Sequence, residues 1–356
     1  MNDKNKNIIV TIIFSSFIII LSIFNIMKKD ENISISERRK LEQFPTFSFS
    51  NLFNGTFFEK FDKYTTDQFI KRDEFRKLKV DIELATKGNY NGLFTYNDYI
   101  IKTMYPLNKS SIVSLTNKIN YIKDNYLNNN NIYFTIIPDK NYFVPNLKID
   151  YNELENIMKQ NLSDITYIDI FPLLKLENYY KTDTHWKQET LTNIALKLAS
   201  SMNFNISNSF TEKELTSFNG VYSSQLPINT SSDAIKILTN NVIQNSHVYN
   251  YETKETTDIY DMTKINSLDK YDVYLSGSTP LITITNDLGE NKELIIFRDS
   301  YASSLVPLLT EGYKKITLVD TRYISSKVLN EFIDFDNKDI LFMYSTLLIN
   351  DSSSIR

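Results

Sequence analysis

The chain has 356 residues, a formal net charge of -4 and 42% hydrophobic content, enough for one large core or a core with a minor subdomain. The small charge and the lack of a Lys/Arg stripe argue against nucleic acid as a partner. The chain has only 7 glycines and contains neither a dinucleotide-binding nor a P-loop motif, so no cofactor is predicted. It has no cysteine, which excludes disulfides, thiolate zinc sites and thiol catalysis.

The first element is an uncharged run of 20 residues at positions 8–27. At about 1.5 Å per residue it spans roughly 30 Å, the thickness of a bilayer hydrocarbon core. The run is longer than a signal-peptide core and no small-residue cleavage site follows it. A buried core helix is the alternative, but the run has no polar face. Residues 1–29 are therefore predicted to be an uncleaved, single-pass anchor in the cell membrane.

The basic residues around this run bear on its orientation. Five of them lie closely after it (Lys28, Lys29, Arg38, Arg39 and Lys40), and two precede it (Lys4 and Lys6). The count mildly disfavours export of the chain beyond the run, although long domains translocate largely regardless of flanking charge. The absence of cysteine is weakly compatible with the outside of the cell. The remainder of the chain is predicted to be extracytoplasmic.

Beyond a juxtamembrane segment at 30–109, residues 110–350 alternate between two periods. Apolar residues at helical spacing predict helices, and short apolar runs predict buried strands. The predicted helices are 110–127, 151–162, a segment around 191–198, 300–309 and 323–332, and the predicted strands are 132–137, 166–171, 294–297, 316–319 and 340–344. This alternation predicts an α/β domain with a mostly parallel sheet flanked by helices. Ligands of such sheets bind beyond the carboxyl ends of the strands, where residues 298–301 fall.

Residues 203–291 interrupt this pattern. Polar runs at 230–233 and 251–257 predict loops and short strands. We interpret this stretch as an irregular insertion that caps the sheet and lines the substrate groove.

Two short motifs carry the chemistry. Asp183-Thr184-His185-Trp186 contains one of two histidines and the only tryptophan, and Arg298-Asp299-Ser300-Tyr301 follows a predicted strand. A serine hydroxyl needs a base to remove its proton, imidazole titrates near working pH, and a carboxylate fixes the imidazole tautomer. On a tight loop, Asp183 could reach a ring nitrogen of His185. At a strand-to-helix turn, Ser300 would be exposed, with helical N–H groups aimed at a developing oxyanion.

Each motif also has a plainer interpretation. His185 beside Trp186 could be a packed core residue, and Ser300 could be a helix N-cap. Asp183 and His185 could also bind a metal, but only His247 is available to accompany them, and it lies in the polar insertion. No metal site is predicted.

The two motifs together resemble the DHHW family of bacterial anchored proteins, which is similar to the SGNH-hydrolase-like proteins of alginate O-acetylation. Shorter blocks resemble the same family in the same order over roughly 310 residues: Glu37-Arg38-Arg39-Lys40-Leu41 with Phe44-Pro45, Asp67-Gln68-Phe69 with Arg72, Pro138-Asp139-Lys140, Phe218-Asn219-Gly220, Leu275-Ser276-Gly277 and Val319-Asp320-Thr321-Arg322-Tyr323. The chain departs from the family at Thr184, which replaces a histidine. Arg298 stands where SGNH hydrolases have glycine, so the resemblance does not identify the groups that form the oxyanion hole.

The resemblance implies an SGNH-hydrolase-like fold in which Ser300 is the nucleophile, His185 the base and Asp183 its orienting acid. It implies transfer of acyl groups, most simply acetyl, to or from hydroxyls of a cell-surface or extracellular polysaccharide. It further implies a multispanning membrane O-acyltransferase as the partner that supplies the acyl group. A carbohydrate acetylesterase with the same triad, or a non-catalytic polymer-binding scaffold, are the alternatives.

Further residues are candidates for contact with the substrate. Arg298 could point at the acyl group or polymer, or only pair with Asp299. Lys140, Arg322 and Tyr323 follow predicted strand ends, and ordinary surface pairing is the alternative for them. Trp186 could stack on a sugar ring or pack to hold His185. Tyr301, next to the nucleophile, completes the predicted substrate-binding set.

Overall fold

A computed structural model describes residues 2–146 and 148–356. Contacts divide the chain into two units. One consists of residues 1–90 with 224–228, and the other of 91–223 with 229–356. The division after residue 90 precedes the predicted boundary at 109, because the hairpin of β3 (Leu93–Tyr96) and β4 (Tyr99–Lys102) packs with the α/β domain.

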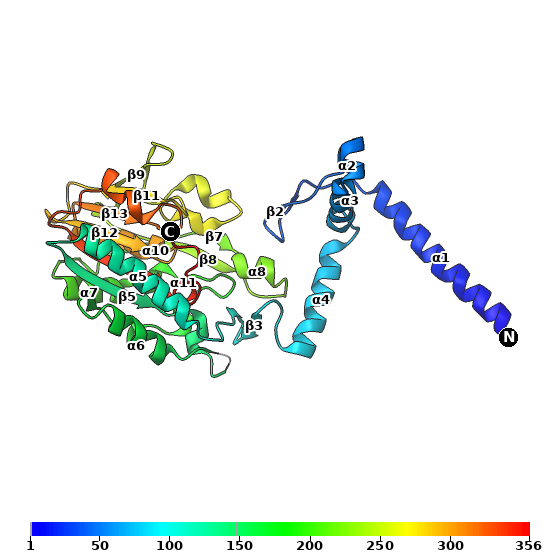
Figure 1. Ribbon diagram of the computed structural model, residues 1–356, viewed down its shortest axis with the longest axis horizontal. Coiled ribbons are helices and arrows are strands. Elements are labelled where there is room, and N and C mark those ends of the chain that lie inside the picture. The colour runs from blue at the N-terminus through cyan, green and yellow to red at the C-terminus, as the bar shows by residue number, and fades with distance from the viewer. Residues whose placement is uncertain (1, 147) are drawn as a thin grey trace. The chain divides into compact units, whose positions relative to one another are not determined.

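The second unit is built on one eight-stranded sheet with the order β10-β9-β11-β13-β12-β14-β5-β6 (Figure 1). Its strands are β5 (Asn131–Ile137), β6 (Thr166–Tyr167), β9 (His247–Asn250), β10 (Thr256–Asp258), β11 (Leu281–Thr285), β12 (Glu293–Arg298), β13 (Lys315–Val319) and β14 (Asp339–Ser345). The pairs from β13 to β6 are parallel, whereas β11, β9 and β10 add an antiparallel edge. The predicted mostly parallel sheet is therefore confirmed.

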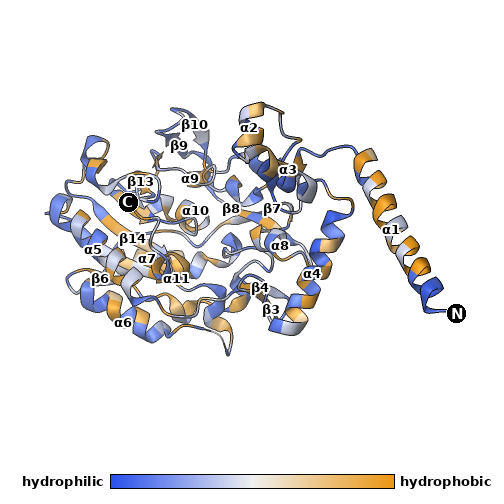
Figure 2. Ribbon diagram, turned by 45° about the vertical axis from the view of Figure 1, so that its right-hand side comes forward, coloured by the Kyte–Doolittle hydropathy of each residue, from blue (hydrophilic) through white to orange (hydrophobic). Residues whose placement is uncertain are grey.

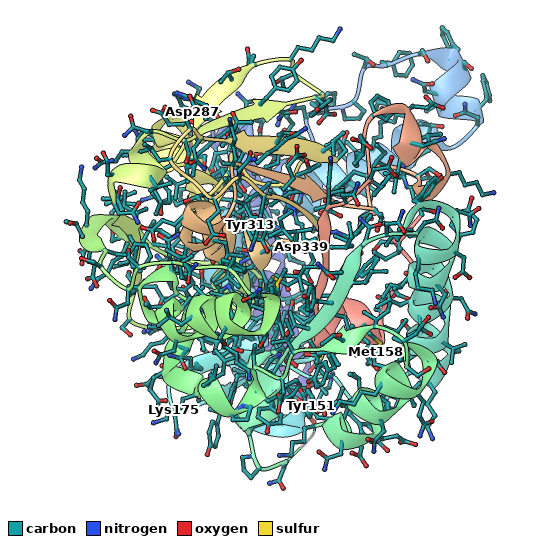
Figure 3. The ribbon with its side chains drawn as sticks, turned by 90° about the vertical axis from the view of Figure 1, so that its left-hand side faces the viewer. Tyr151, Met158, Lys175, Asp287, Tyr313 and Asp339 are labelled. Carbon is teal, nitrogen blue, oxygen red and sulfur yellow. The ribbon has the colours of Figure 1, made fainter. Side chains whose placement is uncertain are left out.

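Alternate side chains of each central strand enter two different cores. In β12, Leu294 and Ile296 belong to the core on one face, and Ile295 and Phe297 to the core on the other. Both faces are apolar because helices cover both of them, which is why the strand sequence is a continuous apolar run. Helices α5 (Lys109–Tyr126) and α6 (Tyr151–Asn161) cover one face, and α7 (Thr192–Met202) covers the other (Figure 3).

The predicted elements differ from the observed ones mainly after the strands of the last third. The helix predicted at 300–309 is one α-turn, α10 (Ala302–Leu305), followed by a 3-10 segment at Val306–Gly312, because Pro307 cannot donate to a continuing helix. The helix predicted at 323–332 is a 3-10 segment at Ser326–Glu331. The strand predicted at 166–171 is only two residues long. The final helix, α11 (Thr346–Asn350), follows β14.

The insertion at 203–291 does more than cap the sheet. It contains the hairpin of β7 (Thr211–Phe218) and β8 (Asp233–Thr239), together with α8 (Val221–Gln225) and α9 (Asn241–Gln244). Its later strands β9, β10 and β11 extend the sheet itself. Short strands were predicted here, but membership of the sheet depends on distant pairing partners.

The first unit begins with α1 (Asp3–Met27), which is long and apolar enough to cross a membrane and has no buried residue (Figure 2). The remaining elements of this unit are β1 (Ile33–Ser34), β2 (Arg39–Lys40), α2 (Phe49–Phe53), α3 (Thr56–Asp67) and α4 (Arg72–Lys87). Asp67 accepts two hydrogen bonds from Arg39, at 2.5 and 2.8 Å, so two of the family-like blocks, 37–41 and 67–69, form one ion-paired cluster.

Candidate active site

Asp183, His185 and Ser300 form a hydrogen-bonded chain at the carboxyl end of the sheet. The Oγ of Ser300 lies 2.8 Å from Nε2 of His185, and Nδ1 of His185 lies 2.6 Å from Oδ1 of Asp183. Ser300 sits in the turn between β12 and α10, while the other two lie on a loop that precedes α7. Asp183 and His185 are buried and Ser300 is partly exposed. The three residues thus have the arrangement of a nucleophile, its base and an orienting carboxylate.

The loop geometry fixes the Asp183 carboxylate. Its Oδ1 accepts a hydrogen bond from the backbone N–H of His185 at 3.0 Å, and its Oδ2 accepts one from that of Val221 at 2.9 Å. Burial raises the pKa of Asp183, but the charge of His185 and these hydrogen bonds outweigh it and lower the pKa to about 2. The carboxylate is therefore ionised near neutral pH and able to stabilise an imidazolium.

Gly220 packs directly against Asp183. A Cβ added at Gly220 would lie only 2.2 Å from Cβ of Asp183, so no larger residue fits without displacing the triad acid. The N–H of Gly220 donates to Thr182 Oγ1 at 2.8 Å, and Thr182 in turn donates to Asp233 at 2.6 Å. The close approach gives a physical reason for glycine in the Phe218-Asn219-Gly220 block.

Tyr271 covers the face of the imidazole and was missed by the sequence reasoning. Its ring stacks on His185 with centroids 3.8 Å apart and planes within 6°. Its hydroxyl donates to Ser304 Oγ at 2.9 Å and approaches the carbonyl of Ser300 at 3.3 Å. Tyr271 thereby touches both halves of the triad. Nothing in the sequence singles it out among 23 tyrosines, because it comes from the irregular insertion.

A left-handed turn follows Tyr271. Leu275 and Ser276 have φ angles of 57° and 59°, a conformation that is costly for residues with a Cβ. Gly277 continues the turn at φ 84°, and a Cβ there would lie 2.4 Å from Oδ1 of Asp272. This turn is the Leu275-Ser276-Gly277 block, and it fixes the path of the segment that carries Tyr271.

Hydrogen bonds of Trp186 and Tyr301 connect the loop that carries His185 to the turn that carries Ser300. The indole N–H of Trp186 donates to the carbonyl of Tyr301 at 2.9 Å, and the hydroxyl of Tyr301 donates to the carbonyl of Thr184 at 2.6 Å. Both side chains are buried, and Trp186 is completely inaccessible. The packing role, rather than stacking on a sugar, therefore describes Trp186 in this structure, and Tyr301 likewise has no open face.

Arg298 is also buried rather than open to a substrate. Its guanidinium faces Ser303 Oγ at 3.2 Å and Thr279 Oγ1 at 3.4 Å, with Asp320 Oδ2 at 4.0 Å. Burial lowers its pKa. The Asp299 carboxylate instead accepts hydrogen bonds from the backbone N–H groups of Tyr301 and Ser345, at 3.0 and 2.8 Å. Of the two roles predicted for Arg298, its burial disfavours contact with a substrate, and its pairing with Asp299 is a long contact of 3.5 Å to the backbone carbonyl rather than to the carboxylate.

The helical N–H groups next to Ser300 are already used. The N–H of Tyr301 donates to Oδ1 of Asp299, that of Ala302 to the carbonyl of Asp299 at 3.3 Å, and that of Ser303 to the carbonyl of Ser300 at 3.2 Å. Within residues 2–146 and 148–356, the N–H of Ser300 itself has no acceptor. The Ser300 N–H is thus a candidate donor to a developing oxyanion, and the predicted use of the following helical N–H groups stays a prediction.

Lys140 follows the carboxyl end of β5, and Arg322 and Tyr323 follow that of β13, with β14 and β12 between these two strands. Lys140 is buried and its Nζ donates to the carbonyls of Tyr180 and Lys181, at 3.0 and 3.3 Å, just ahead of the triad loop. Burial lowers its pKa to about 7. Arg322 pairs with both oxygens of Asp320 at 2.9 and 2.6 Å. Tyr323 is 49% exposed, so it is the most open of the predicted substrate-binding side chains.

A cavity of about 790 Å³ lies at the other end of the sheet. Its lining includes the first residues of β5, β12, β13 and β14, together with Asp287, but no triad residue. Asp287 and Asp339, two of its lining residues, are labelled in Figure 3. The hydroxyl of Tyr313 donates to Oδ2 of Asp339 at 2.9 Å. His247 lies on β9, and no group of three His, Cys, Asp or Glu in the described part of the chain could hold a metal. The triad geometry, rather than the size of this cavity, locates the candidate site.

Comparison with known proteins gives fold-level likenesses. No family model matches the chain, and no curated protein matches it in sequence. The fold is similar to that of a DHHW family protein from Eubacterium siraeum, with a TM-score of 0.62 at 16% identity over 75% of this chain and 94% of that one. It is also similar to PatB1 of Bacillus cereus, both with a sulfonyl adduct (TM-score 0.60, 18% identity, 72% and 95% of the two chains) and without it (0.58, 19%, 72% and 96%). The predicted resemblance to DHHW proteins is thereby confirmed at the level of the fold, as is the predicted α/β architecture with a mostly parallel sheet.

We expect Gly220→Ala to lower turnover by on the order of 10²-fold, since the new methyl group displaces Asp183 and misaligns the base. Ester hydrolysis or transfer by the purified protein measures this effect. Ser217→Ala, an equally small change on the exposed end of the same hairpin, is the control. Equal activities of the two variants would contradict the role assigned to Gly220.

Tyr271→Leu removes the ring that lies on His185, and we expect kcat to fall roughly tenfold with KM unchanged. Tyr271→Phe keeps the stacked ring and loses only the hydroxyl contacts, so it should retain most of the activity. Steady-state kinetics on both variants separates stacking from a general effect on folding. Identical losses for Phe and Leu would show that the stack itself contributes nothing.

Asp183→Asn changes the pH dependence of stability. The folded pKa of Asp183 lies near 2, below its ordinary 3.8, so the carboxylate stabilises the fold above about pH 4 and loses this contribution as the pH falls toward 2. The difference in free energy of unfolding between wild type and variant should therefore shrink by on the order of 2 kcal/mol over that range. Urea unfolding at several pH values measures it, and a constant difference would refute the assignment.

Proposed function

We propose that the protein is a membrane-anchored, extracytoplasmic O-acyltransferase that acts on a cell-surface or extracellular polysaccharide through Ser300, His185 and Asp183. The observation that carries the proposal is the continuous chain of contacts from Ser300 Oγ to His185 Nε2 at 2.8 Å and from His185 Nδ1 to Asp183 at 2.6 Å. Such a chain increases the nucleophilicity of a hydroxyl.

The reaction would proceed in two steps. Ser300 Oγ attacks the acyl carbonyl while His185 Nε2 takes its proton, and the N–H of Ser300 is placed to donate to the oxyanion. Collapse of the tetrahedral intermediate gives an acyl-serine, and His185 returns the proton to the leaving group. An acceptor hydroxyl then attacks the acyl-serine with His185 again as base, which regenerates Ser300 and leaves an ester on the acceptor.

The sequence resemblance and the anchor suggest the substrate and the partner. DHHW-like proteins suggest an acetyl group and a polysaccharide acceptor, and α1 would hold the enzyme at the membrane where such polymers emerge. A multispanning membrane O-acyltransferase would supply the acyl group. Arg322 and Tyr323, which lie at the carboxyl end of β13, are the candidates that remain accessible to a polymer.

Hydrolysis is the competing outcome of the same triad. An acyl-serine that meets water before a sugar hydroxyl makes the protein a carbohydrate acetylesterase. Ser300 is partly exposed, so water is able to reach the acyl-enzyme when no acceptor occupies the site. Product analysis, and not geometry, distinguishes the two activities.

We expect the purified full-length protein to cleave a chromogenic acetyl ester and to acetylate an added oligosaccharide. Ser300→Ala should lower both activities by at least about 10³-fold, because no other hydroxyl in the described part of the chain lies on Nε2 of His185. Ser200→Ala, an exposed serine on α7, is the matched control. The relative yields of acetate and acetylated sugar decide between transferase and esterase.

A sulfonyl fluoride gives an independent readout of the nucleophile. The similar PatB1 of Bacillus cereus is known with a sulfonyl adduct, so this chemistry suits the fold. Mass spectrometry should place the adduct on Ser300 in the wild type and find none there in His185→Ala. Full activity of Ser300→Ala would overturn the mechanism. No activity and no adduct in the wild type would favour a non-catalytic scaffold.

A further inference from the structure

Six phenylalanines next to the membrane anchor lie with their rings in solvent. They are Phe44, Phe47, Phe49, Phe53, Phe58 and Phe61, and we call them the aromatic patch. Phe49 is 71% exposed and Phe53 is 86% exposed, although phenylalanine is usually buried. So many exposed rings within 18 residues indicate a surface that is covered by something.

The rings pack on one another and not into a core. Phe44 meets Phe61 edge to face at 6.0 Å, Phe47 meets Phe49 at 5.6 Å, and Phe57 lies among them as the half-buried centre. On α3 the aromatic residues recur at 57, 58, 61 and 64, whereas 59, 60, 62 and 63 are charged. The helix therefore has one aromatic face and one charged face, as helices at a membrane surface do.

Hydrogen bonds attach this segment to the end of α1. The backbone N–H of Ile70 donates to Asn25 Oδ1 at 2.8 Å, and Gln68 exchanges two hydrogen bonds of 2.9 Å with the backbone of Glu31. The hydroxyl of Tyr64, on the aromatic face of α3, donates to Asp30 at 3.2 Å. Asn25 is two residues, or about 3 Å of helix, from the last apolar residue, Met27.

We infer that the aromatic patch lies in the interfacial layer of the bilayer that α1 crosses, on the side where α1 ends. The occupant of the patch is thus a lipid surface. The attachment of α3 to residues 25–31 places the patch at the depth where the apolar run stops, which is the depth at which surface helices bury a face of Phe, Trp or Leu side chains. The charged face of α3 is balanced, since exposed Glu59 and Asp62 accompany Lys60 and Lys63, so the membrane contact depends on the aromatic rings rather than on net charge.

Lipid fits these observations better than a protein partner. If α1 crosses a membrane, groups hydrogen-bonded to residues 25–31 lie at the surface of that membrane. A protein partner would have to bind there through additional contacts. The inference rests on the membrane insertion of α1, which is part of the proposed function, and it is independent of the triad. Its consequence is that the first unit has two membrane contacts, a span and a surface helix.

The absence of cysteine makes the test direct, because single cysteines can be labelled without removing native ones. Phe49→Cys and Phe53→Cys of the full-length protein carry an environment-sensitive fluorophore in nanodiscs of phosphatidylcholine and phosphatidylglycerol. Ile18→Cys, in the middle of α1, reports insertion. Thr86→Cys, exposed near the end of α4, is the control for an aqueous site. Nitroxide lipids with shallow or deep spin labels serve as quenchers.

We expect the labels at 49 and 53 to shift their emission to the blue and to lose more emission to the shallow than to the deep nitroxide. The label at 18 should be quenched by the deep one, and that at 86 by neither. An aqueous label at 49 and 53 with a deep label at 18 would overturn the inference while leaving the anchor intact. Shielding of 49 and 53 only in native membranes would overturn it in favour of a protein partner. A shallow label at 18 would overturn both the anchor and the inference.

Discussion

The hydrogen bond between His185 and Ser300 is the contact on which the proposed chemistry depends. It joins a loop ahead of α7 to the turn after β12, across 115 residues of sequence, at 2.8 Å. A serine hydroxyl without this contact is a weak nucleophile. The sheet makes the contact possible because parallel strands bring their carboxyl ends to one edge, where loops from distant segments meet.

The rest of the second unit holds the two sides of that contact at a fixed separation. Trp186 and Tyr301 exchange hydrogen bonds between the loop and the turn, and Tyr271 lies against both. Next to the loop, Gly220 lies too close to Asp183 for a side chain, and Lys140 donates to the carbonyls of Tyr180 and Lys181. Most of these side chains are buried, so the residues next to the triad motifs serve as its supports more than as its substrate contacts. A nucleophile positioned within tenths of an ångström requires such support.

Arg298 departs from the motif of related hydrolases, and the fold accommodates it as a buried, hydrogen-bonded side chain. SGNH hydrolases have glycine at this position, and an arginine there suggested a charge in the substrate pocket. The guanidinium instead lies beneath the site, close to Asp320, Thr279 and the turn at 275–277. Removing its charge from water is costly, and the nearby carboxylate and hydroxyl groups offset that cost. Arg298 therefore packs inside the domain, and in the proposed mechanism the backbone N–H of Ser300 is the candidate donor to the oxyanion.

The sequence by itself determined the elements whose signal is local. A 20-residue uncharged run is long and apolar enough to cross a membrane, and apolar strands such as residues 294–297 alternate with amphipathic helices as in an α/β sheet. Asp183, His185 and Ser300 could be predicted as a candidate triad because histidine occurs only twice in the chain and the two short motifs match a known family pattern in combination. The other side chains that contact these three residues could be identified only from the tertiary structure. The stacking of Tyr271, the burial of Arg298 and Trp186, and the sheet strands inside the insertion all depend on contacts between distant segments. A one-dimensional pattern encodes periodicity and composition, but those contacts arise from the packing of the whole domain.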